Sequence, residues 1–302
     1  MGVSPLQEIQ YGASKAKGLR LYMKRDDLLH PILSGNKWRK LCYNLSAAKV
    51  VGKGTLLSFG GAYSNHIHAL SAAGELLGFR TIGIIRGEEP AVYGATLRFA
   101  CDAGMRFRFL SRSAYRKKEI PADIDLEDVY VLPEGGSNYL AIKGCREIVE
   151  EVATQLEDAP ADYYCLAVGT GGTTTGVIDG LAGRGQVLGF SVLKGSFLHR
   201  DIQFFQKEYQ LQQYSNWRVV NDYHFGGYAR FQMTLIDFIK RFFEETGICL
   251  DPVYTGKMVY GVFDLIAKDY FPKGSRIVLI HTGGLQGVAG FEERYGIGIF
   301  DS

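Results

Sequence analysis

A lysine placed directly behind a glycine and an asparagine is the first feature of the sequence that could do chemistry. Lys37 lies in the segment LSGNKWRKL, residues 33 to 41, and Arg39 and Lys40 follow it closely. An unprotonated amine is a nucleophile, so such a lysine can bind a carbonyl compound covalently. The same segment also fits a helix with a solvated basic face, and on its own it leaves both interpretations open.

A segment rich in glycine and threonine gives the strongest signal for an anion. AVGTGGTTTG, residues 167 to 176, continues an apolar run and precedes the expected helix VIDGLAG. Small residues let the backbone approach a phosphate, and a helix N-terminus adds a positive end. Neither familiar nucleotide motif is complete, because Thr174 stands at the third glycine of GxGxxG and no GK[ST] follows. Thr170 and Thr173 can donate hydrogen bonds instead, so a phosphate site is predicted, with an empty tight turn as the alternative.

Another glycine turn precedes an expected helix in SFGGAYSNHIHALSAAG, residues 58 to 74. Ser64 and Asn65 fall where a helix is capped, and capping alone explains them. The functional interpretation is that this helix start presents Ser64 and free amides to a substrate carboxylate, while the Asn65 amide reaches a cofactor oxygen. His66 fits either a helix surface or the same site.

Two polar clusters late in the chain complete the set. LDPVYTGK spans residues 250 to 257, and IHTGG spans residues 280 to 284. Tyr254, Thr255 and Thr282 are ordinary residues for a turn or a strand end. Both clusters nevertheless occupy the strand-end or helix-start position at which α/β proteins build their sites.

The elements that must position these residues alternate between strand and helix. Apolar runs bounded by glycine predict buried parallel strands at LLSFGG, TIGIIRG, VYVLPEGG, YYCLAVGTGG, VLGFSVL and RIVLIHTGG. Helical spacing falls between them, as in NHIHALSAAGELLG, ATLRFACDAG and FQMTLIDFIKRFFEETG. The predicted fold class is α/β, with parallel sheets covered on both faces and ligands at the carboxyl ends of the strands.

The chain is expected to form two domains. The acidic segment EEVATQLEDAPAD, residues 150 to 162, separates two α/β blocks. We expect residues 1–42 and 151–302 to form a large cofactor-binding domain and residues 43–150 to form a small one.

Charge and cysteine content narrow the function. The 302 residues include 34 basic and 32 acidic side chains, so no strong field favours nucleic acid or a membrane surface, and a small molecule is the expected partner. The five cysteines are scattered without a CxxC pair, and no histidine stands at metal-ligand spacing. Reduced thiols and no metal are therefore expected. The N-terminus has no signal-peptide pattern and no run of about 18 apolar residues occurs, so we expect a cytoplasmic protein.

The candidate groups together match the needs of pyridoxal phosphate (PLP): an amine, a phosphate-binding turn, a capped helix start and late hydroxyls. The segments KRDDLLHPILSGNKWRKL, GGAYSNHIHALSAA, PEGGSNYLAIKG, GTGGTTTG, LDPVYTGK and HTGG resemble, in this order, the D-cysteine desulfhydrase and 1-aminocyclopropane-1-carboxylate (ACC) deaminase family. The resemblance covers nearly the whole chain. It implies a fold of the tryptophan synthase β-subunit type (PLP fold type II), a small amino-acid substrate and a homodimer.

The resemblance also assigns roles to single residues. Lys37 matches the Schiff-base lysine, and Lys40 matches the lysine that reaches the phosphate. Asn65 matches the family residue that binds the ring hydroxyl of the cofactor. Ser64 matches the family residue that binds the substrate carboxylate. The other matches are Gly169, Thr170, Gly171, Gly172 and Thr173 for the phosphate loop, His66 for the substrate side, Tyr254 beside the substrate Cα, and Thr255 with Thr282 near the pyridine nitrogen.

One departure from the family pattern predicts the reaction. ACC deaminases carry a glutamate where Thr255 stands, and a carboxylate keeps the pyridine nitrogen protonated whereas a threonine does not. His66 after Asn65 is likewise the desulfhydrase-like residue. We therefore expect α,β-elimination, in which D-cysteine gives pyruvate, ammonia and sulfide. The alternatives are an ACC deaminase, a catalytically idle PLP-binding protein and, more distantly, a nucleotide-dependent oxidoreductase, whose dinucleotide fingerprint is absent.

Overall fold

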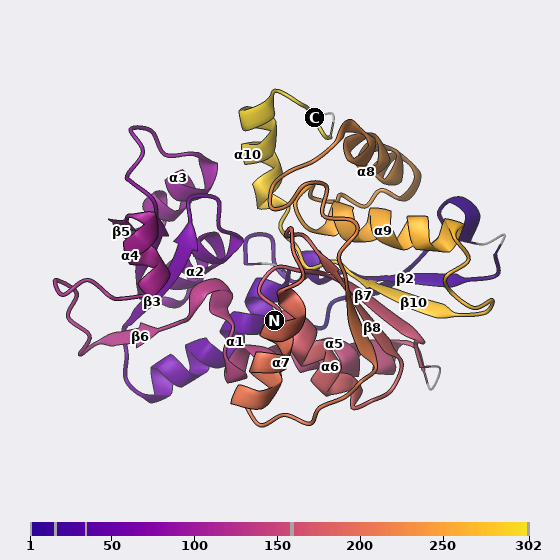
Figure 1. Ribbon diagram of the computed structural model, residues 1–302. Coiled ribbons are helices and arrows are strands. Elements are labelled where there is room, and N and C mark those ends of the chain that lie inside the picture. Colours follow the sequence, from indigo (N-terminus) through magenta and orange to yellow (C-terminus); the bar gives the residue numbers. More distant parts are fainter. Residues whose placement is uncertain (1, 15–16, 34, 158–159, 301–302) are drawn as a thin grey trace.

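Two mainly parallel β-sheets, each with helices packed on it, form the two halves of the molecule (Figure 1). The computed structural model describes residues 2–14, 17–33, 35–157 and 160–300. The predicted α/β fold with two parallel-sheet units is confirmed, and all six apolar runs bounded by glycine form strands. None of the helices in these ranges is long and apolar enough to cross a membrane.

The larger sheet has six strands in the order β1-β2-β10-β7-β8-β9, and within it β1 runs antiparallel to β2. Its strands are β1 (Leu6–Ile9), β2 (Arg20–Lys24), β7 (Tyr163–Val168), β8 (Gln186–Ser191), β9 (Trp217–Val220) and β10 (Arg276–Ile280). The central strand β10 is buried on both faces, because Ile277 and Leu279 belong to one core and Val278 and Ile280 to the other. A strand with no solvated face has no polar side, which explains the apolar run RIVLI.

Helices cover both faces of this sheet. One core includes side chains of α8 (Met233–Thr246) and α9 (Thr255–Ala267). The opposite core includes side chains of α5 (Tyr139–Gln155), α6 (Gly172–Leu181) and α7 (Leu198–Glu208). The remaining elements of this half are α10 (Gln286–Tyr295) and the short 3₁₀ helices η1 (Gly12–Ser14) and η2 (Asp26–Leu28).

The smaller sheet has four parallel strands in the order β5-β4-β3-β6. Its strands are β3 (Thr55–Gly61), β4 (Arg80–Arg86), β5 (Arg106–Leu110) and β6 (Val129–Val131), and its other elements are α2 (Asn65–Leu77), α3 (Ala95–Asp102), α4 (Arg112–Lys117) and η3 (Glu134–Gly136). The helices α2 and α3 pack on one face, whereas Tyr115 of α4 joins a smaller core on the other. Ser64 caps α2, and its hydroxyl accepts from the Ile67 amide at 3.3 Å, as the capping interpretation predicts.

Two packed helices connect the halves. The predicted domain limits at 42/43 and 150/151 fall inside α1 (Gly35–Val50) and α5, and residues 158–159 of the acidic segment lie outside the described residues. The two helices approach so closely that a Cβ at Gly144 of α5 would overlap the Arg39 carbonyl of α1. The assignment of residues to two domains stays a prediction, but the chain crosses between the sheets within continuous helices.

A buried ionic network fixes α1 to its neighbours. Arg39 is 3% exposed and pairs with Asp26 at 2.8 Å and with Glu151 of α5. Lys24 of β2, which is fully buried, pairs with the same Glu151 at 2.5 Å. Because a buried charge that loses its partner is strongly destabilising, these pairs restrict the position of α1 and of the two lysines that precede and follow Arg39.

Candidate active site

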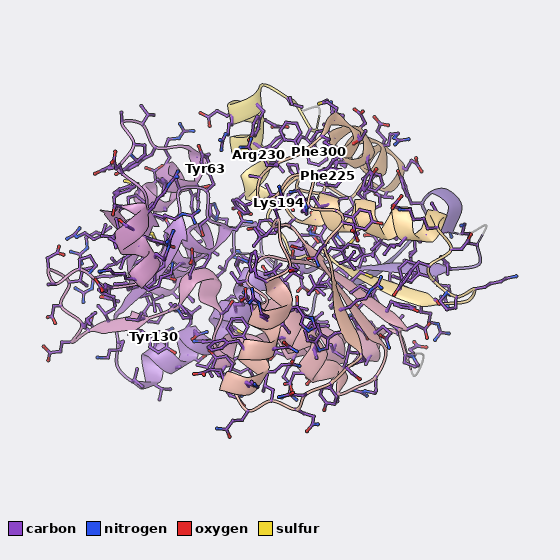
Figure 2. The ribbon with its side chains drawn as sticks, viewed as in Figure 1. Tyr63, Tyr130, Lys194, Phe225, Arg230 and Phe300 are labelled. Atoms are coloured by element: carbon purple, nitrogen blue, oxygen red, sulfur yellow. The ribbon has the colours of Figure 1, made fainter. Side chains whose placement is uncertain are left out.

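The chemistry-bearing segments of the sequence meet at one cavity that draws on both halves of the molecule. Its volume is about 420 Å³, within the roughly 300–1,000 Å³ typical of small-molecule sites. Figure 2 labels Tyr63, a lining residue that follows β3 of the four-stranded sheet, and Lys194, which follows β8 of the six-stranded sheet and is next in sequence to the lining residue Leu193. The predicted site residues that line it are Lys37, Lys40, Ser64, Asn65, His66, Gly169, Thr170, Gly171, Thr173, Tyr254 and Thr282. Gly172 and Thr255 are not among the lining residues.

Lys37 reaches the cavity because α1 begins with a turn that suits glycine. Gly35 has a φ of +66°, and a Cβ there would overlap the Thr282 carbonyl. The Asn36 amide donates to that carbonyl at 3.2 Å, and Lys37 Nζ donates to Asn36 Oδ1 at 3.0 Å. The start of α1 is thus fastened to the 280–284 segment, and the amine projects into the cavity.

The surroundings of Lys37 favour a nucleophilic amine. Burial lowers the pKa of Lys37 to about 7, and the positive charge of Lys40 adds to the effect. A large fraction of the amine is then unprotonated at neutral pH and able to attack a carbonyl carbon. The alternative of a solvated basic face does not hold, because Arg39 and Lys40 are 3% and 2% exposed.

The glycine-rich segment forms the N-terminus of α6 at the wall of the cavity. Gly171, at the N-cap, has a φ of +82°, a left-handed conformation that favours glycine. The first N–H groups of a helix lack partners within the helix and can bind an anion. Thr173 adds a hydroxyl, which accepts from Asn36 Nδ2 at 2.9 Å. Gly172 stands behind the lining, and a Cβ there would lie 2.6 Å from Ser137 Oγ.

Lys40 supports the same turn from α1. Its ammonium donates to the Gly135 carbonyl at 3.0 Å, to Ser137 Oγ at 2.9 Å and to Thr170 Oγ1 at 3.3 Å. Burial lowers the pKa of Lys40 to about 8. Its hydrogen bonds and its place beside the helix N-terminus make Lys40 a source of positive charge for a bound anion, in contrast to the amine of Lys37.

His66, the second residue of α2, contributes a polar atom without a partner. Ser58 Oγ donates to the Leu132 carbonyl at 3.0 Å and lies 2.8 Å from His66 Nε2, so it accepts from that nitrogen. Burial lowers the pKa of His66 well below its usual value, and the ring is neutral. His66 Nδ1 is then a buried acceptor that has no hydrogen-bond partner among the described residues. Such an atom next to a cavity indicates a site built for a polar ligand.

Tyr254 and Thr255 lie next to each other but have different surroundings. Burial raises the pKa of Tyr254 well above its usual value, and the neighbouring Tyr228 hydroxyl adds to this. Tyr254 lines the cavity beside Gly169. Thr255 is fully buried, and its hydroxyl donates to Asp251 Oδ1 at 2.7 Å and accepts from the Asp251 amide at 2.9 Å. Both hydrogen bonds of the Thr255 hydroxyl stay within this turn. Thr255 does not line the cavity, whereas the predicted contact with the cofactor requires that it does.

Five large lining side chains were not predicted from the sequence: Tyr63, Arg86, Glu134, Leu193 and Tyr228. Arg86 ends β4 and Glu134 follows β6, so their position at the carboxyl ends of predicted strands was an available signal. Tyr228 lies in an irregular segment before α8, where no pattern indicated a site.

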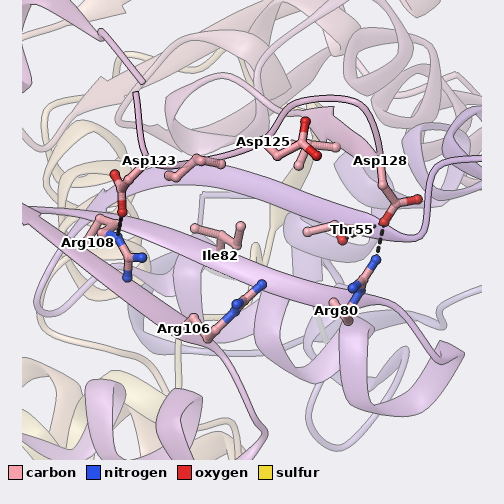
Figure 3. A pocket seen from close by; sticks show the side chains of 10 residues that line it. Thr55, Arg80, Ile82, Arg106, Arg108, Asp123, Asp125 and Asp128 are labelled. Atoms are coloured by element: carbon pink, nitrogen blue, oxygen red, sulfur yellow. Dashed lines mark hydrogen bonds and ion pairs between the residues drawn. The ribbon is translucent and has the colours of Figure 1, made fainter. Parts of the chain in front are cut away.

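A second, smaller cavity of about 250 Å³ lies on the four-stranded sheet (Figure 3). Arg108 pairs there with Asp123 at 2.8 Å, and Arg80 pairs with Asp128. Its lining contains no lysine or cysteine. Over the residues that the structure describes, no group of three or more His, Cys, Asp or Glu side chains is arranged to hold a metal ion. The first cavity is therefore the candidate active site.

The fold and this site are those of a PLP enzyme, and the chain belongs to the family of pyridoxal-phosphate dependent enzymes, which it matches over residues 1–283. It is 32% identical to the bifunctional, mitochondrial D-cysteine desulfhydrase/ACC deaminase of Arabidopsis thaliana, over 90% of this chain and 74% of that protein. It is 30% identical to the D-cysteine desulfhydrase of Klebsiella pneumoniae, over 88% of this chain and 87% of that one.

Solved structures confirm the predicted fold type. The crystal structure of an ACC deaminase homologue superposes with a TM-score of 0.84 at 30% identity and covers 97% of this chain and 93% of its own. The O-acetylserine dependent cystathionine β-synthase of Helicobacter pylori shares the fold at 17% identity, with a TM-score of 0.70, over 99% of this chain and 96% of its own.

The site residues fit PLP, the cofactor of this family. An amine of lowered pKa, Lys37, is available for the aldehyde. The N-terminus of α6 and Lys40 offer N–H groups and positive charge for the phosphate. His66 Nδ1 is an acceptor without a partner among the described residues, and Thr282 lines the cavity beside the start of α1. Each part of the cofactor thus has a chemically suitable group.

Proposed function

We propose that the chain catalyses α,β-elimination from a small amino acid, with D-cysteine and water giving pyruvate, ammonia and hydrogen sulfide. The observation that carries the proposal is the amine of Lys37, whose pKa is lowered to about 7 in a cavity that also holds an anion-binding helix N-terminus. The activities named for the Arabidopsis and Klebsiella relatives support this choice of reaction.

Lys37 has two tasks in this proposal. PLP, when bound, withdraws electrons from the substrate Cα and so makes its proton acidic. Lys37 would anchor the cofactor covalently and would be released when the substrate amine binds in its place. Its amine, whose pKa is lowered to about 7, would then be the base that accepts the Cα proton near neutral pH.

The other lining residues bind and orient. The segment 169–173 and Lys40 hold the phosphate, mainly through backbone N–H groups, with hydroxyls of Thr170 and Thr173. Asn65 and Thr282, which line the cavity, would hold the ring, and the amides at the start of α2 with Ser64 would bind the substrate carboxylate. Tyr254 lies beside Cα, where its high pKa keeps the hydroxyl protonated and able to donate.

ACC deaminase is the second candidate, because the Arabidopsis relative is named for both activities. A catalytically idle PLP-binding protein is the third. One experiment separates them: purified protein is loaded with PLP and offered a panel of D- and L-amino acids and ACC, and the oxo acid is identified. Pyruvate with sulfide supports elimination, 2-oxobutanoate from ACC supports the deaminase, and retained PLP without any product supports the idle protein.

The proposal extends to the whole molecule. We propose that residues 1–42 and 151–302 act as the PLP-binding domain and residues 43–150 as the smaller domain, that the enzyme works as a homodimer, and that it resides in the cytoplasm. All five cysteines are free thiols, which suits a reducing compartment. Light scattering of the purified protein tests the dimer, since a mass equal to that of one chain contradicts it.

A further inference from the structure

Asp251 carries a carboxylate that is buried beside the cavity without lining it. The residue is 2% exposed, and it stands between the end of α8 and the start of α9. Burying a carboxylate is unfavourable unless hydrogen bonds or positive charge compensate. The contacts of this side chain therefore indicate what it does.

The carboxylate closes the turn that carries Tyr254. One oxygen, Oδ2, accepts from the amides of Val253 at 2.8 Å and Tyr254 at 2.7 Å. The other, Oδ1, accepts from the Thr255 amide at 2.8 Å and from the Thr255 hydroxyl at 2.7 Å. Three of these four bonds come from backbone N–H groups at or just before the N-terminus of α9, the end of a helix that attracts negative charge. The backbone of Tyr254 is held by this one side chain.

The same carboxylate packs against the segment that follows β10. A Cβ at Gly284 would lie 3.4 Å from Asp251 Oδ1 and 3.1 Å from Asn65 Nδ2. Gly284 has a φ of +96°, so this close approach occurs at a position that favours glycine. Asp251 is thus placed between the turn of Tyr254 and the segment that begins with Thr282.

We propose that Asp251 is a positioning residue of the active site: it holds Tyr254 against the substrate, supports the Thr282 segment and supplies a negative charge near the amine of Lys37. The proposal rests on the proposed function for what Tyr254 and Lys37 do there. The hydrogen bonds of Asp251 and its charge have separable consequences, because only the charge acts on Lys37 through space.

The titratable groups that interact electrostatically with Lys37 come from four parts of the chain. Lys40 on α1 lowers the pKa of Lys37, whereas Cys145 on α5 and Asp251 before α9 raise it. His66 on α2 is neutral and is itself affected by the charge of Lys37. Removal of the Asp251 charge should therefore lower the pKa of Lys37 further.

Removal of the Asp251 charge should also lower the pKa of Tyr254. Its pKa is raised by burial first, then by Tyr228 and by Asp251. Loss of the Asp251 charge lowers both the pKa of the lysine and that of the tyrosine. A residue with a purely structural role would change stability but would move neither of them.

The test compares Asp251→Asn with a matched control, Asp128→Asn. Asp128 likewise accepts from a backbone amide, that of Gly54, at 2.8 Å and from the Thr55 hydroxyl at 2.8 Å, but it lies at the second cavity (Figure 3). In cofactor-free protein, the rate of acetic anhydride labelling of Lys37 is followed against pH by peptide mass. We expect the midpoint to fall by ~0.5 pH unit in Asp251→Asn and to stay in place in Asp128→Asn. Equal midpoints in all three proteins overturn the role of the charge.

Turnover of D-cysteine by the PLP-loaded proteins tests the positioning. In Asp251→Asn, kcat should fall at least ~10-fold with PLP still bound, and both limbs of the pH–rate profile should move to lower pH. If this variant does not fold, Thr255→Val removes one bond to the carboxylate and keeps the charge. That variant should lower kcat with an unchanged labelling midpoint, and wild-type kcat in it overturns the positioning role. The labelling needs no turnover, so a wild-type protein that releases no product would contradict the proposed function and leave the test of the Asp251 charge intact.

Discussion

Two lysines three positions apart on α1 show how local contacts separate two roles. Burial lowers the pKa of both Lys37 and Lys40, to about 7 and about 8. Lys40 donates three hydrogen bonds to groups around the α6 turn, whereas Lys37 donates to the side chain of the neighbouring Asn36. A lysine with three fixed acceptors binds an anion as an ammonium, and a lysine with a lowered pKa and one acceptor is the better nucleophile.

The first prediction follows from this contrast. Lys37→Ala should bind PLP weakly and release no pyruvate from D-cysteine, because the covalent anchor and the base at Cα are removed together. Lys49→Ala, on the exposed last turn of the same helix, is the control and should retain activity. Peptide mapping after borohydride reduction should find the PLP adduct on Lys37. Full activity of Lys37→Ala, or an adduct on another lysine, would contradict the assignment.

The threonines of the α6 turn give the second prediction. Thr170→Val and Thr173→Val should each weaken PLP binding by ~1.5–3 kcal/mol, the value of one hydrogen bond to a charged group. The reaction type should not change, because the backbone N–H groups remain in place. Titration of cofactor-free protein with PLP measures the affinity. If the double variant binds PLP as tightly as the wild type, the phosphate lies elsewhere.

The third prediction concerns pH and the stability of the cofactor-free protein. The pKa of Lys37 is about 7 in the folded chain and near 10.5 when exposed. Between these values the unfolded chain binds a proton that the folded chain does not, so the free energy of unfolding rises with pH. We expect the free energy of unfolding, measured with urea, to increase from pH 7 to pH 9, and to increase less in Lys37→Met. An equal gain in both proteins would show that Lys37 titrates normally.

At the scale of elements, continuous apolar runs predicted six of the ten strands in the described part of the chain, including the edge strand β6, whereas β1, β2, β5 and β9 were not predicted. RIVLI became β10 and LLSFGG became β3, because continuous apolar runs are distinctive. β1 (LQEI) and β5 (RFRFL) are edge strands with charged or polar side chains, and no apolar run marks them. Their position depends on the neighbouring strand, which a local pattern does not contain.

The acidic segment after residue 150 was interpreted as a separator, but its first residues complete α5. Glu151, which is partly buried, is the partner of the buried Lys24 and Arg39, which lie more than 100 positions earlier. A charge that will be paired in the core looks the same in the sequence as a solvated one. Thr255 illustrates the same limit within the site, because its nearest partner, Asp251, decides that its hydroxyl faces the turn and not the cavity.

The contact of α1 with α5 gives the fourth prediction. Gly144→Ala should destabilise the protein by ~1–3 kcal/mol or more, because the new methyl would overlap the Arg39 carbonyl and the backbone must move. Since α1 carries Lys37 and Lys40, PLP affinity should fall as well. Gly290→Ala in α10, where a Cβ has no neighbour within 4 Å, should be neutral or stabilising. Thermal unfolding and PLP titration measure both effects, and equal behaviour of the two variants would contradict the packing argument.

At the scale of the whole molecule, the cavity combines groups that neither half holds alone. Ser64, Asn65 and Arg86 come with the four-stranded sheet, and Tyr254 and Thr282 come with the six-stranded one. The one carboxylate among the described lining residues is Glu134. It is engaged by the Tyr115 hydroxyl at 2.7 Å and by Lys118 at 2.6 Å. No lining carboxylate is therefore left uncommitted to support a protonated pyridine nitrogen.

This charge arrangement favours elimination over opening of the ACC ring. The cyclopropane ring of ACC has no good leaving group. Its opening therefore benefits from a protonated pyridine nitrogen on the cofactor, which a carboxylate partner would stabilise. Elimination of sulfide needs less electron withdrawal by the cofactor ring, because sulfide leaves readily. The hydroxyl of Thr282, which lines the cavity, can donate a hydrogen bond to a neutral ring nitrogen. We expect kcat/KM for D-cysteine to exceed that for ACC by at least ~10-fold, and Tyr254→Phe to impair turnover with PLP still bound. Steady-state assays of pyruvate and 2-oxobutanoate measure the ratio. A kcat/KM for ACC equal to or above that for D-cysteine would make the deaminase the main activity.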